Sequence, residues 1–164
     1  MSAVRPAAVA GLFYPADSRQ LKRDVQKFLA TAQPQTLNAK ALIVPHAGYM
    51  YSGAIAASAY TTLKSVAPRI RRVILLGPTH RVAVNGLAVP DTDAFVTPLG
   101  RVQLDVDAMR TVSGLPQVIV SNEAHEEEHS LEVQLPFLQS VLNGFTLLPL
   151  AVGKIGRASC RERV

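Results

Sequence analysis

The sequence predicts an α/β domain with a mostly parallel central sheet and helices on both faces. Short apolar runs such as Ala41–Val44 and Arg72–Leu76 are typical of strands that are buried on both faces. Segments with apolar residues at helical spacing separate such runs along the chain. Strands that alternate with helices are joined by right-handed crossovers, which predicts a parallel sheet between two helical layers.

We expect the first third of the chain to form a helix, then the first strand, and then a second helix. A helix begins at Asp17 or Ser18, either of which can act as its N-cap. Its apolar residues recur at helical spacing, at Leu21, Val25, Phe28 and Leu29. After the strand at 41–44, Ser52 can cap an alanine-rich helix over 53–66, whose small side chains favour close packing on a sheet.

The rest of the chain is expected to continue this alternation. The buried strand at 72–76 is followed by two half-exposed strands, a short helix, another strand, a longer helix and a final buried strand. These elements are placed at residues 82–89 and 94–96, 105–111, 117–120, 131–142 and 145–150. The longer helix starts after Ser130, and Pro136 within it predicts a kink or a late start.

The composition indicates a globular domain without a membrane span. Hydrophobic residues make up 48% and charged residues 18% of the 164 positions, which differs from a disordered chain. No apolar run approaches the ~18 residues that a spanning helix requires, and the first ten residues do not resemble a signal peptide. We therefore expect no membrane association and a cytoplasmic location.

The last ten residues, IGRASCRERV, differ in character from the preceding chain. This arginine-rich string resembles the in-frame translation of a sequencing adaptor. We therefore expect one domain over 1–154 and a non-native tail over 155–164 that includes Cys160; a genuine basic tail is the alternative. The string carries +2 of the formal net charge of +5. The remaining charge forms no basic stripe, so nucleic-acid binding is not expected.

Two histidines follow the two strand-like runs. His46 comes just after Ala41–Val44, in the string VPHAGYMYSG, and His80 comes just after Arg72–Leu76, in LLGPTHRV. In open α/β sheets, ligands bind beyond the carboxyl ends of the strands. A single histidine in such a loop is more often structural, but two with the same placement indicate a binding or catalytic site.

A second histidine pair occurs in the string HEEEH, as His125 and His129. The string matches the H-E-x-x-H zinc-protease pattern, which requires a buried helix with both imidazoles on one face. Here the three residues between the histidines are all glutamate, and helical periodicity begins only after Ser130. We therefore expect no protease site. His129 is expected at the crevice near a helix N-terminus, and residues 126–128 are expected to form a solvated acidic face.

Five strings of the sequence, taken in order, resemble the Memo family, whose bacterial and archaeal members are called AmmeMemoRadiSam system protein B. The strings are AGLFYP, ALIVPHAGYMYSG, ILLGPTH, TPLG and EAHEEEHSLEVQLPFLQ. The resemblance implies a three-layer α/β/α fold related to the class III extradiol ring-cleaving dioxygenases. In those enzymes two histidines and a carboxylate hold a non-haem Fe(II) ion.

The resemblance also implies roles for three histidines. His46 and His80 match the family histidines associated with metal binding, and His129 matches the histidine of the EHS string in the same pocket. Iron or copper is the implied metal, redox chemistry the implied activity, and a radical SAM protein and an AMMECR-type protein the implied partners. The substrate, a small molecule or a protein, stays open. A non-catalytic binding or scaffold protein on the same fold is the alternative function.

The chain also departs from the family pattern. Family members continue through an S-S-D-x-x-H-type segment and a later cysteine that contribute to the pocket, and Cys160 lacks the context of that cysteine. We therefore expect the fold to be incomplete at its C-terminal end and the third metal ligand to be absent. With His46 and His80 as ligands and His129 as a catalytic acid or base, metal binding by this chain is expected to be weak.

Overall fold

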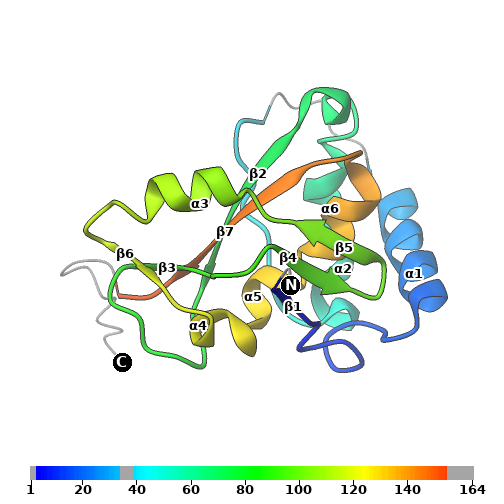
Figure 1. Ribbon diagram of the computed structural model, residues 1–164. Coiled ribbons are helices and arrows are strands. Elements are labelled where there is room, and N and C mark those ends of the chain that lie inside the picture. Colours follow the sequence, from blue (N-terminus) through cyan, green and yellow to red (C-terminus); the bar gives the residue numbers. More distant parts are fainter. Residues whose placement is uncertain (1–2, 34–38, 155–164) are drawn as a thin grey trace, which may run out of the picture.

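The computed structural model describes residues 3–33 and 39–154, which form two β-sheets with helices packed around them (Figure 1). The larger sheet has the strand order β2 (Arg72–Pro78), β7 (Thr146–Val152), β3 (Leu87–Val89) and β6 (Val118–Val120). The smaller sheet has the order β1 (Val4–Arg5), β4 (Ala94–Thr97) and β5 (Gly100–Gln103).

The helices flank these sheets, as the predicted three-layer α/β/α fold requires. They are α1 (Ser18–Thr31), α2 (Tyr49–Thr61), α3 (Val106–Val112), α4 (Glu123–Glu126), α5 (His129–Glu132) and α6 (Leu135–Val141), with a 3₁₀ turn η1 at Ala67–Arg69. The predicted α/β class is confirmed.

Strand β7 organises the larger sheet. It pairs in parallel with β2 along its whole length, from Thr146 opposite Arg72 to Val152 opposite Pro78. On its other side it pairs antiparallel with β3, and β3 pairs in parallel with β6. The sheet is therefore mostly parallel, as predicted. The predicted strand at 145–150 is also confirmed, and it is buried because its side chains pack into the hydrophobic core.

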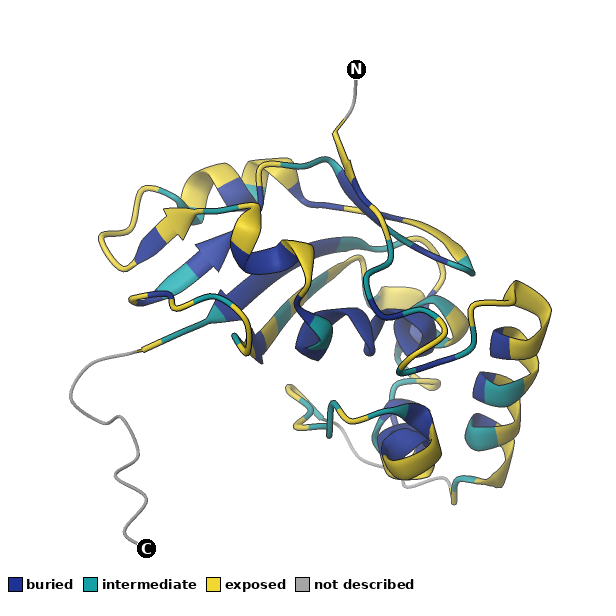
Figure 2. Cartoon of the chain, turned by 90° about the horizontal axis from the view of Figure 1, so that it is seen from below, coloured by how far each residue is buried: buried dark blue, intermediate teal, exposed yellow. Residues whose placement is uncertain are grey.

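Helices α1, α2 and α6 pack together and contribute to the main hydrophobic core, with their buried faces turned inward (Figure 2). The predicted helical spacing in α1 buries Leu21, Val25 and Leu29. Asp17 is confirmed as its N-cap, because Asp17 Oδ1 accepts a hydrogen bond from Gln20 N at 2.8 Å.

The segment 41–44 does not form a strand, so the prediction of two neighbouring buried strands is wrong. Ile43 is fully exposed, and a cavity of about 420 Å³ is lined by residues of 39–44 and of β2. Strand β2 lies at the edge of the sheet, and its Ile74 and Leu76 are 58% and 57% exposed. Within the described residues, no strand pairs with 41–44 or with the free edge of β2. An apolar run becomes a strand only where a neighbour supplies hydrogen bonds.

Helix α2 begins one turn earlier than predicted. Its N-cap is Gly48, and Tyr49 N donates to the Phe13 carbonyl at 2.8 Å. Ser52 lies inside the helix, where its Oγ donates to the Ala47 carbonyl at 2.9 Å. The predicted cap at Ser52 is therefore wrong, and the start of α2 is brought close to the histidine at position 46.

The predicted long helix after Ser130 is divided into α5 and α6. Pro136 lies in the first turn of α6, which confirms the predicted late start. Of the two strands expected to be half-exposed, β3 forms over a shorter range than predicted and β4 over a range one residue longer, and both are mostly buried. The short helix and the strand after it are confirmed as α3 and β6.

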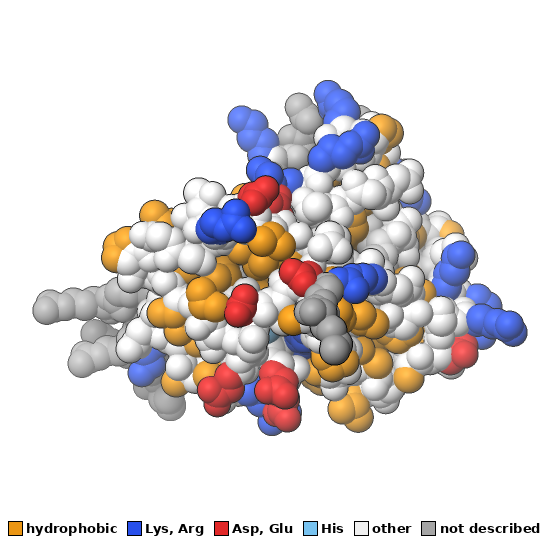
Figure 3. Space-filling view, in the orientation of Figure 1, with side chains coloured by type: hydrophobic (Ala, Val, Ile, Leu, Met, Phe, Trp, Pro, Cys, Tyr) orange, Lys and Arg blue, Asp and Glu red, His pale blue; other side chains and the backbone are white. Residues whose placement is uncertain are grey.

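No helix within residues 3–33 and 39–154 is long and apolar enough to cross a membrane. On the face drawn in Figure 3, Lys and Arg side chains lie mostly around the upper and right margins, and acidic side chains lie nearer the centre and the lower edge. Charges of both signs are therefore present on this face. The predicted adaptor-like tail at 155–164, with Cys160, lies outside the described residues.

Candidate metal centre

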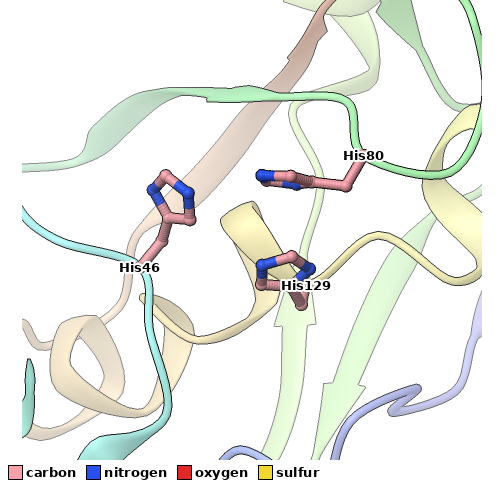
Figure 4. A group of neighbouring side chains, drawn as sticks. All are labelled: His46, His80 and His129. Atoms are coloured by element: carbon pink, nitrogen blue, oxygen red, sulfur yellow. The ribbon is translucent and has the colours of Figure 1, made fainter. Parts of the chain in front are cut away.

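The structure brings His46, His80 and His129 together from three separate segments of the chain. His46 lies in the loop before α2, His80 lies just past the end of β2, and His129 is the first residue of α5 (Figure 4). Each side chain offers one ring nitrogen, and these nitrogens all lie within 4.8 Å of one another. The ring centroids of His80 and His129 are 4.3 Å apart, and those of His46 and His80 are 5.2 Å apart.

A close contact between β2 and α5 sets the distance between His80 and His129. Ser130 Oγ donates to the Pro78 carbonyl at 2.8 Å. Gly77 permits this approach, because a Cβ at position 77 would lie only 2.6 Å from Ser130 Oγ. The Gly-Pro pair before His80 therefore lets a helix start against the strand end.

The carboxylate of Glu128 joins the histidine loop of β2 to the start of α5. Its Oε1 accepts hydrogen bonds from His80 Nδ1 and from Ser130 N, both at 2.9 Å. Its Oε2 accepts from the backbone N of His80 at 2.6 Å. Glu128 Oε1 also lies 3.4 Å from His129 Nδ1. This residue is buried, so the expectation that 126–128 form a solvated face is wrong at position 128.

A second buried carboxylate, Glu132, anchors α5 to the N-terminal segment. It is fully buried, and its Oε2 lies 2.6 Å from Arg5 Nη1. Its oxygens also accept from the backbone N of Ala8 and Val9 and from Tyr14 Oη, at 2.5 to 3.0 Å. The satisfied charges hold the helix that begins with His129.

Hydrogen bonds from α6 and its neighbours fix the loop that carries His46. Gln134 Nε2 donates to the Pro45 carbonyl at 3.0 Å, and Tyr60 Oη donates to Gln134 Oε1 at 2.8 Å. Tyr49 Oη donates to the Val133 carbonyl at 2.7 Å. The backbone on both sides of His46 is therefore tied to the segment that follows α5.

Burial keeps two of the clustered imidazoles in the neutral form that binds metal. Desolvation, together with the neighbouring His80, lowers the pKa of His46. Desolvation also lowers the pKa of His129, although Glu128 opposes it. For Glu128, burial alone would raise the pKa, but the hydrogen bonds from Ser130 and His80 lower it to about 2. The candidate site thus combines two neutral imidazoles, those of His46 and His129, with an ionised carboxylate at neutral pH.

An apolar hollow opens beside the histidines. Its lining includes Phe13, Ile43, Pro45 and Tyr51, together with His46 and His129. The ring of Phe13 packs against His129 with 4.5 Å between centroids. A ligand in this hollow would contact apolar side chains and the imidazole rings of His46 and His129.

His125 takes no part in this cluster, and the predicted absence of a zinc-protease helix is confirmed. Helix α4 ends at Glu126, and α5 begins at His129. The buried Nε2 of His125 donates to the Ala88 carbonyl at 2.9 Å, and the Phe95 ring lies 5.9 Å from the His125 ring between centroids. The two histidines of HEEEH are therefore not side by side on one regular helix.

Sequence reasoning singled out the three clustered histidines but missed Glu128 and the anchoring role of Glu132. In the structure the Glu128 side chain accepts from the backbone N two residues later and is the N-cap of α5, but glutamate is not a preferred N-cap residue, so residue type did not indicate this role. Ser130 was assigned that cap instead. No local signal identifies the partner of Glu132, because Arg5 is more than a hundred residues away in the sequence.

Comparison with known proteins agrees with the resemblance noted in the sequence. The chain is 39% identical over 154 residues to the "Protein memo-1 homolog" of Caenorhabditis elegans, covering 92% of this chain and 43% of that protein. It is 38% identical over 150 residues to a "MEMO1 family protein" of Aquifex aeolicus, covering 91% and 55%. It is 35% identical over 168 residues to the "Protein MEMO1" of Xenopus laevis, covering 98% and 55%.

The chain spans about half the length of these curated relatives. Residues 5–162 match the protein family described as "Memo-like protein". The match includes all three clustered histidines and both buried carboxylates. This chain therefore belongs to the Memo-like protein family.

Proposed function

We propose that His46, His80 and His129 form a transition-metal site that serves redox chemistry. One observation carries the proposal: three imidazole nitrogens, delivered by three separate segments, lie within 4.8 Å of one another. Structural histidines rarely gather in this way, because each gains its hydrogen bond from backbone or water. A metal ion bound by His46 and His80, with His129 beside it as an acid or base, would account for the cluster.

The donor set fits iron or copper better than a hard cation such as magnesium. Imidazole nitrogen suits zinc, copper, iron and nickel, whereas magnesium and calcium prefer oxygen ligands. Neutral imidazoles are needed for ligation, and burial lowers the pKa of His46 and His129. A buried carboxylate behind His80 adds the outer-shell partner that metal-binding histidines commonly have.

In this proposal the three histidines have different roles. His46 and His80 hold the metal, and His129 acts as the acid or base beside it. A bound iron or copper ion would supply electron transfer and Lewis-acid chemistry. His129 is suited to accept a proton because its ring is neutral at neutral pH and borders the apolar hollow.

We also propose that the activity belongs to a cytoplasmic system with a radical SAM protein and an AMMECR-type protein. The support is the family membership together with what the Memo resemblance implies about its bacterial and archaeal members. The apolar hollow beside the histidines offers a place for a small-molecule or peptide substrate.

Metal content tests the site directly. The chain would be purified without oxygen and titrated with Fe²⁺ or Cu²⁺ while bound metal is measured by mass spectrometry. We expect weak binding that saturates at about one equivalent per chain, because the third ligand is absent, and loss of this binding in His46→Ala and His80→Ala, because each removes a ligand. His129→Ala should retain metal and lose redox turnover. Glu127→Gln, an exposed change nearby, is the control.

Two outcomes would contradict these assignments. If His46→Ala and His80→Ala bind metal as the unchanged chain does, the cluster is not the metal site. If His129→Ala loses metal as completely as they do, His129 is a third ligand and the acid or base must be sought elsewhere.

A further inference from the structure

We propose that Glu128 is a positioning residue that sets the orientation and the tautomer of His80, so that Nε2 of His80 is the nitrogen presented to the cluster. This inference rests on the proposed metal site, because it explains how one of the ligands is held ready. It assigns a role to one of three consecutive glutamates, and that role depends on the structure around it.

Burial separates Glu128 from its two neighbours in the sequence. Glu126 and Glu127 are exposed, whereas Glu128 is only 2% exposed. Burying a carboxylate costs free energy unless hydrogen bonds compensate the lost hydration. Here the compensating donors come from the loop of His80 and from the start of α5. The buried carboxylate is therefore stable only where these two segments lie together.

Both oxygens of Glu128 contact His80. Oε1 accepts from the ring Nδ1 at 2.9 Å, and Oε2 accepts from the backbone N of the same residue at 2.6 Å. Oε1 also accepts from Ser130 N at 2.9 Å. The carboxylate cannot rotate without losing one of these bonds, so the ring of His80 is held in one direction.

The hydrogen bond to Nδ1 has a chemical consequence for the other ring nitrogen. A neutral imidazole carries one proton, and a carboxylate oxygen can only accept. The proton therefore sits on Nδ1, and the lone pair sits on Nε2, where a metal ion can use it. Metal-binding histidines commonly have this kind of outer partner, and its removal typically weakens metal binding by ~10- to 100-fold.

A helix cap alone would not need this arrangement. Capping α5 requires only the bond from Ser130 N to Oε1. The two bonds to His80 add nothing to the cap, yet each carboxylate oxygen accepts one of them. Glu128 also lies 3.4 Å from His129 Nδ1, so it faces two of the three clustered rings.

The test begins with the metal-free protein, so that it does not depend on metal binding. Imidazole ¹⁵N chemical shifts would be recorded about two pH units above the usual imidazole pKa of about 6.5. In the unchanged chain and in Glu127→Gln, His80 should carry its proton on Nδ1. In Glu128→Gln the side-chain amide can donate to Nδ1, so the proton should move to Nε2 in a large share of molecules.

Metal affinity is the second readout, with Co²⁺ as the probe. Glu128→Gln should weaken Co²⁺ binding by ~10- to 100-fold, and Glu127→Gln should leave it unchanged. Glu128→Asp keeps the charge but shortens the side chain by one methylene. It should also weaken binding, because the position of the oxygens matters as well as their charge.

Several outcomes would overturn the proposal. A proton on Nε2 of His80 in the unchanged chain would do so without any variant. So would a Glu128→Gln protein whose His80 tautomer and Co²⁺ affinity match those of Glu127→Gln. If Glu128→Gln does not fold, the tautomer of the unchanged chain and the affinity of Glu128→Asp decide. If the unchanged chain binds no metal, the proposed function fails while the tautomer result still decides the role of Glu128.

Discussion

The two histidines of the HEEEH string, His125 and His129, lie in different environments although they are only four positions apart in the sequence. His125 is buried in α4, where its Nε2 donates to a backbone carbonyl and its Nδ1 has no hydrogen-bond partner among residues 3–33 and 39–154. His129 begins α5, is partly exposed and faces two other histidines. The difference shows that a short string does not assign roles. The element to which each residue belongs decides them.

The glutamates around these histidines differ in the same way. Glu126 and Glu127 are exposed, whereas Glu128 and Glu132 are buried and hydrogen-bonded. The buried pair belongs to α5, which holds His129 and contacts the loop of His80. The acidic residues that face solvent belong to α4 and the turn after it. The residues that cap or form α5 therefore contribute to the candidate site, whereas the residues of α4 have a structural role.

Glu132→Ala should have the largest effect, because it would leave Arg5 buried without its partner. Breaking a buried ion pair in this way costs about 3–5 kcal/mol in the free energy of unfolding. Urea denaturation followed by circular dichroism would measure the loss. Asp107→Ala removes the exposed pair with Arg110 and serves as the control, with little expected change. Equal losses in the two variants would contradict the anchoring role of Glu132.

The pH dependence of stability should reveal His125 next. Burial lowers the pKa of His125 to about 4, so the unfolded chain takes up a proton at this residue before the folded protein does. Its contribution to stability is complete above pH ~6.5 and is lost as the pH falls towards ~4, by roughly 3 kcal/mol in total.

Denaturation series at several pH values would measure this slope. His125→Asn should unfold more easily at pH 7 but show a shallower loss of stability between pH ~6.5 and ~4. The remaining slope would come from His46 and His129, whose pKa values are also lowered. An unchanged slope in His125→Asn would show that the α4 side of the string is not the acid-sensitive part.

Glu126→Gln should have the smallest effect of the set. The side chain is exposed, so its replacement should change the free energy of unfolding by less than ~0.5 kcal/mol. Thermal melts of the variant and the unchanged chain would test this. A loss of stability close to that of Glu132→Ala would contradict the proposed difference between the exposed and the buried glutamates.

The fold was predictable where local pattern and tertiary contacts agree. Helix α1 has an acidic cap and apolar residues at helical spacing, and all of these are found in the structure. The segment 41–44 shows where local pattern is insufficient. Its apolar residues are typical of a strand, yet strand formation depends on a neighbour that supplies hydrogen bonds. Such a neighbour cannot be identified from the segment itself.

The site was predictable to the extent that strand ends deliver residues to one edge of a sheet. That argument singled out His46 and His80, although the strand assumed before His46 does not form. Glu128 could not be distinguished from Glu126 and Glu127 by residue type or spacing. Only the contact between the end of β2 and α5 places Glu128 against His80.

Electron paramagnetic resonance of the chain loaded with one equivalent of Cu²⁺ tests the central claim most directly. The claim is that His46 and His80, from two separate segments of the chain, bind one metal ion through imidazole nitrogens, with His129 beside them. We predict a single Cu²⁺ species with nitrogen hyperfine structure, which is lost in His80→Ala and retained in His125→Asn. A spectrum that survives in the His46→Ala, His80→Ala, His129→Ala triple variant would contradict the account.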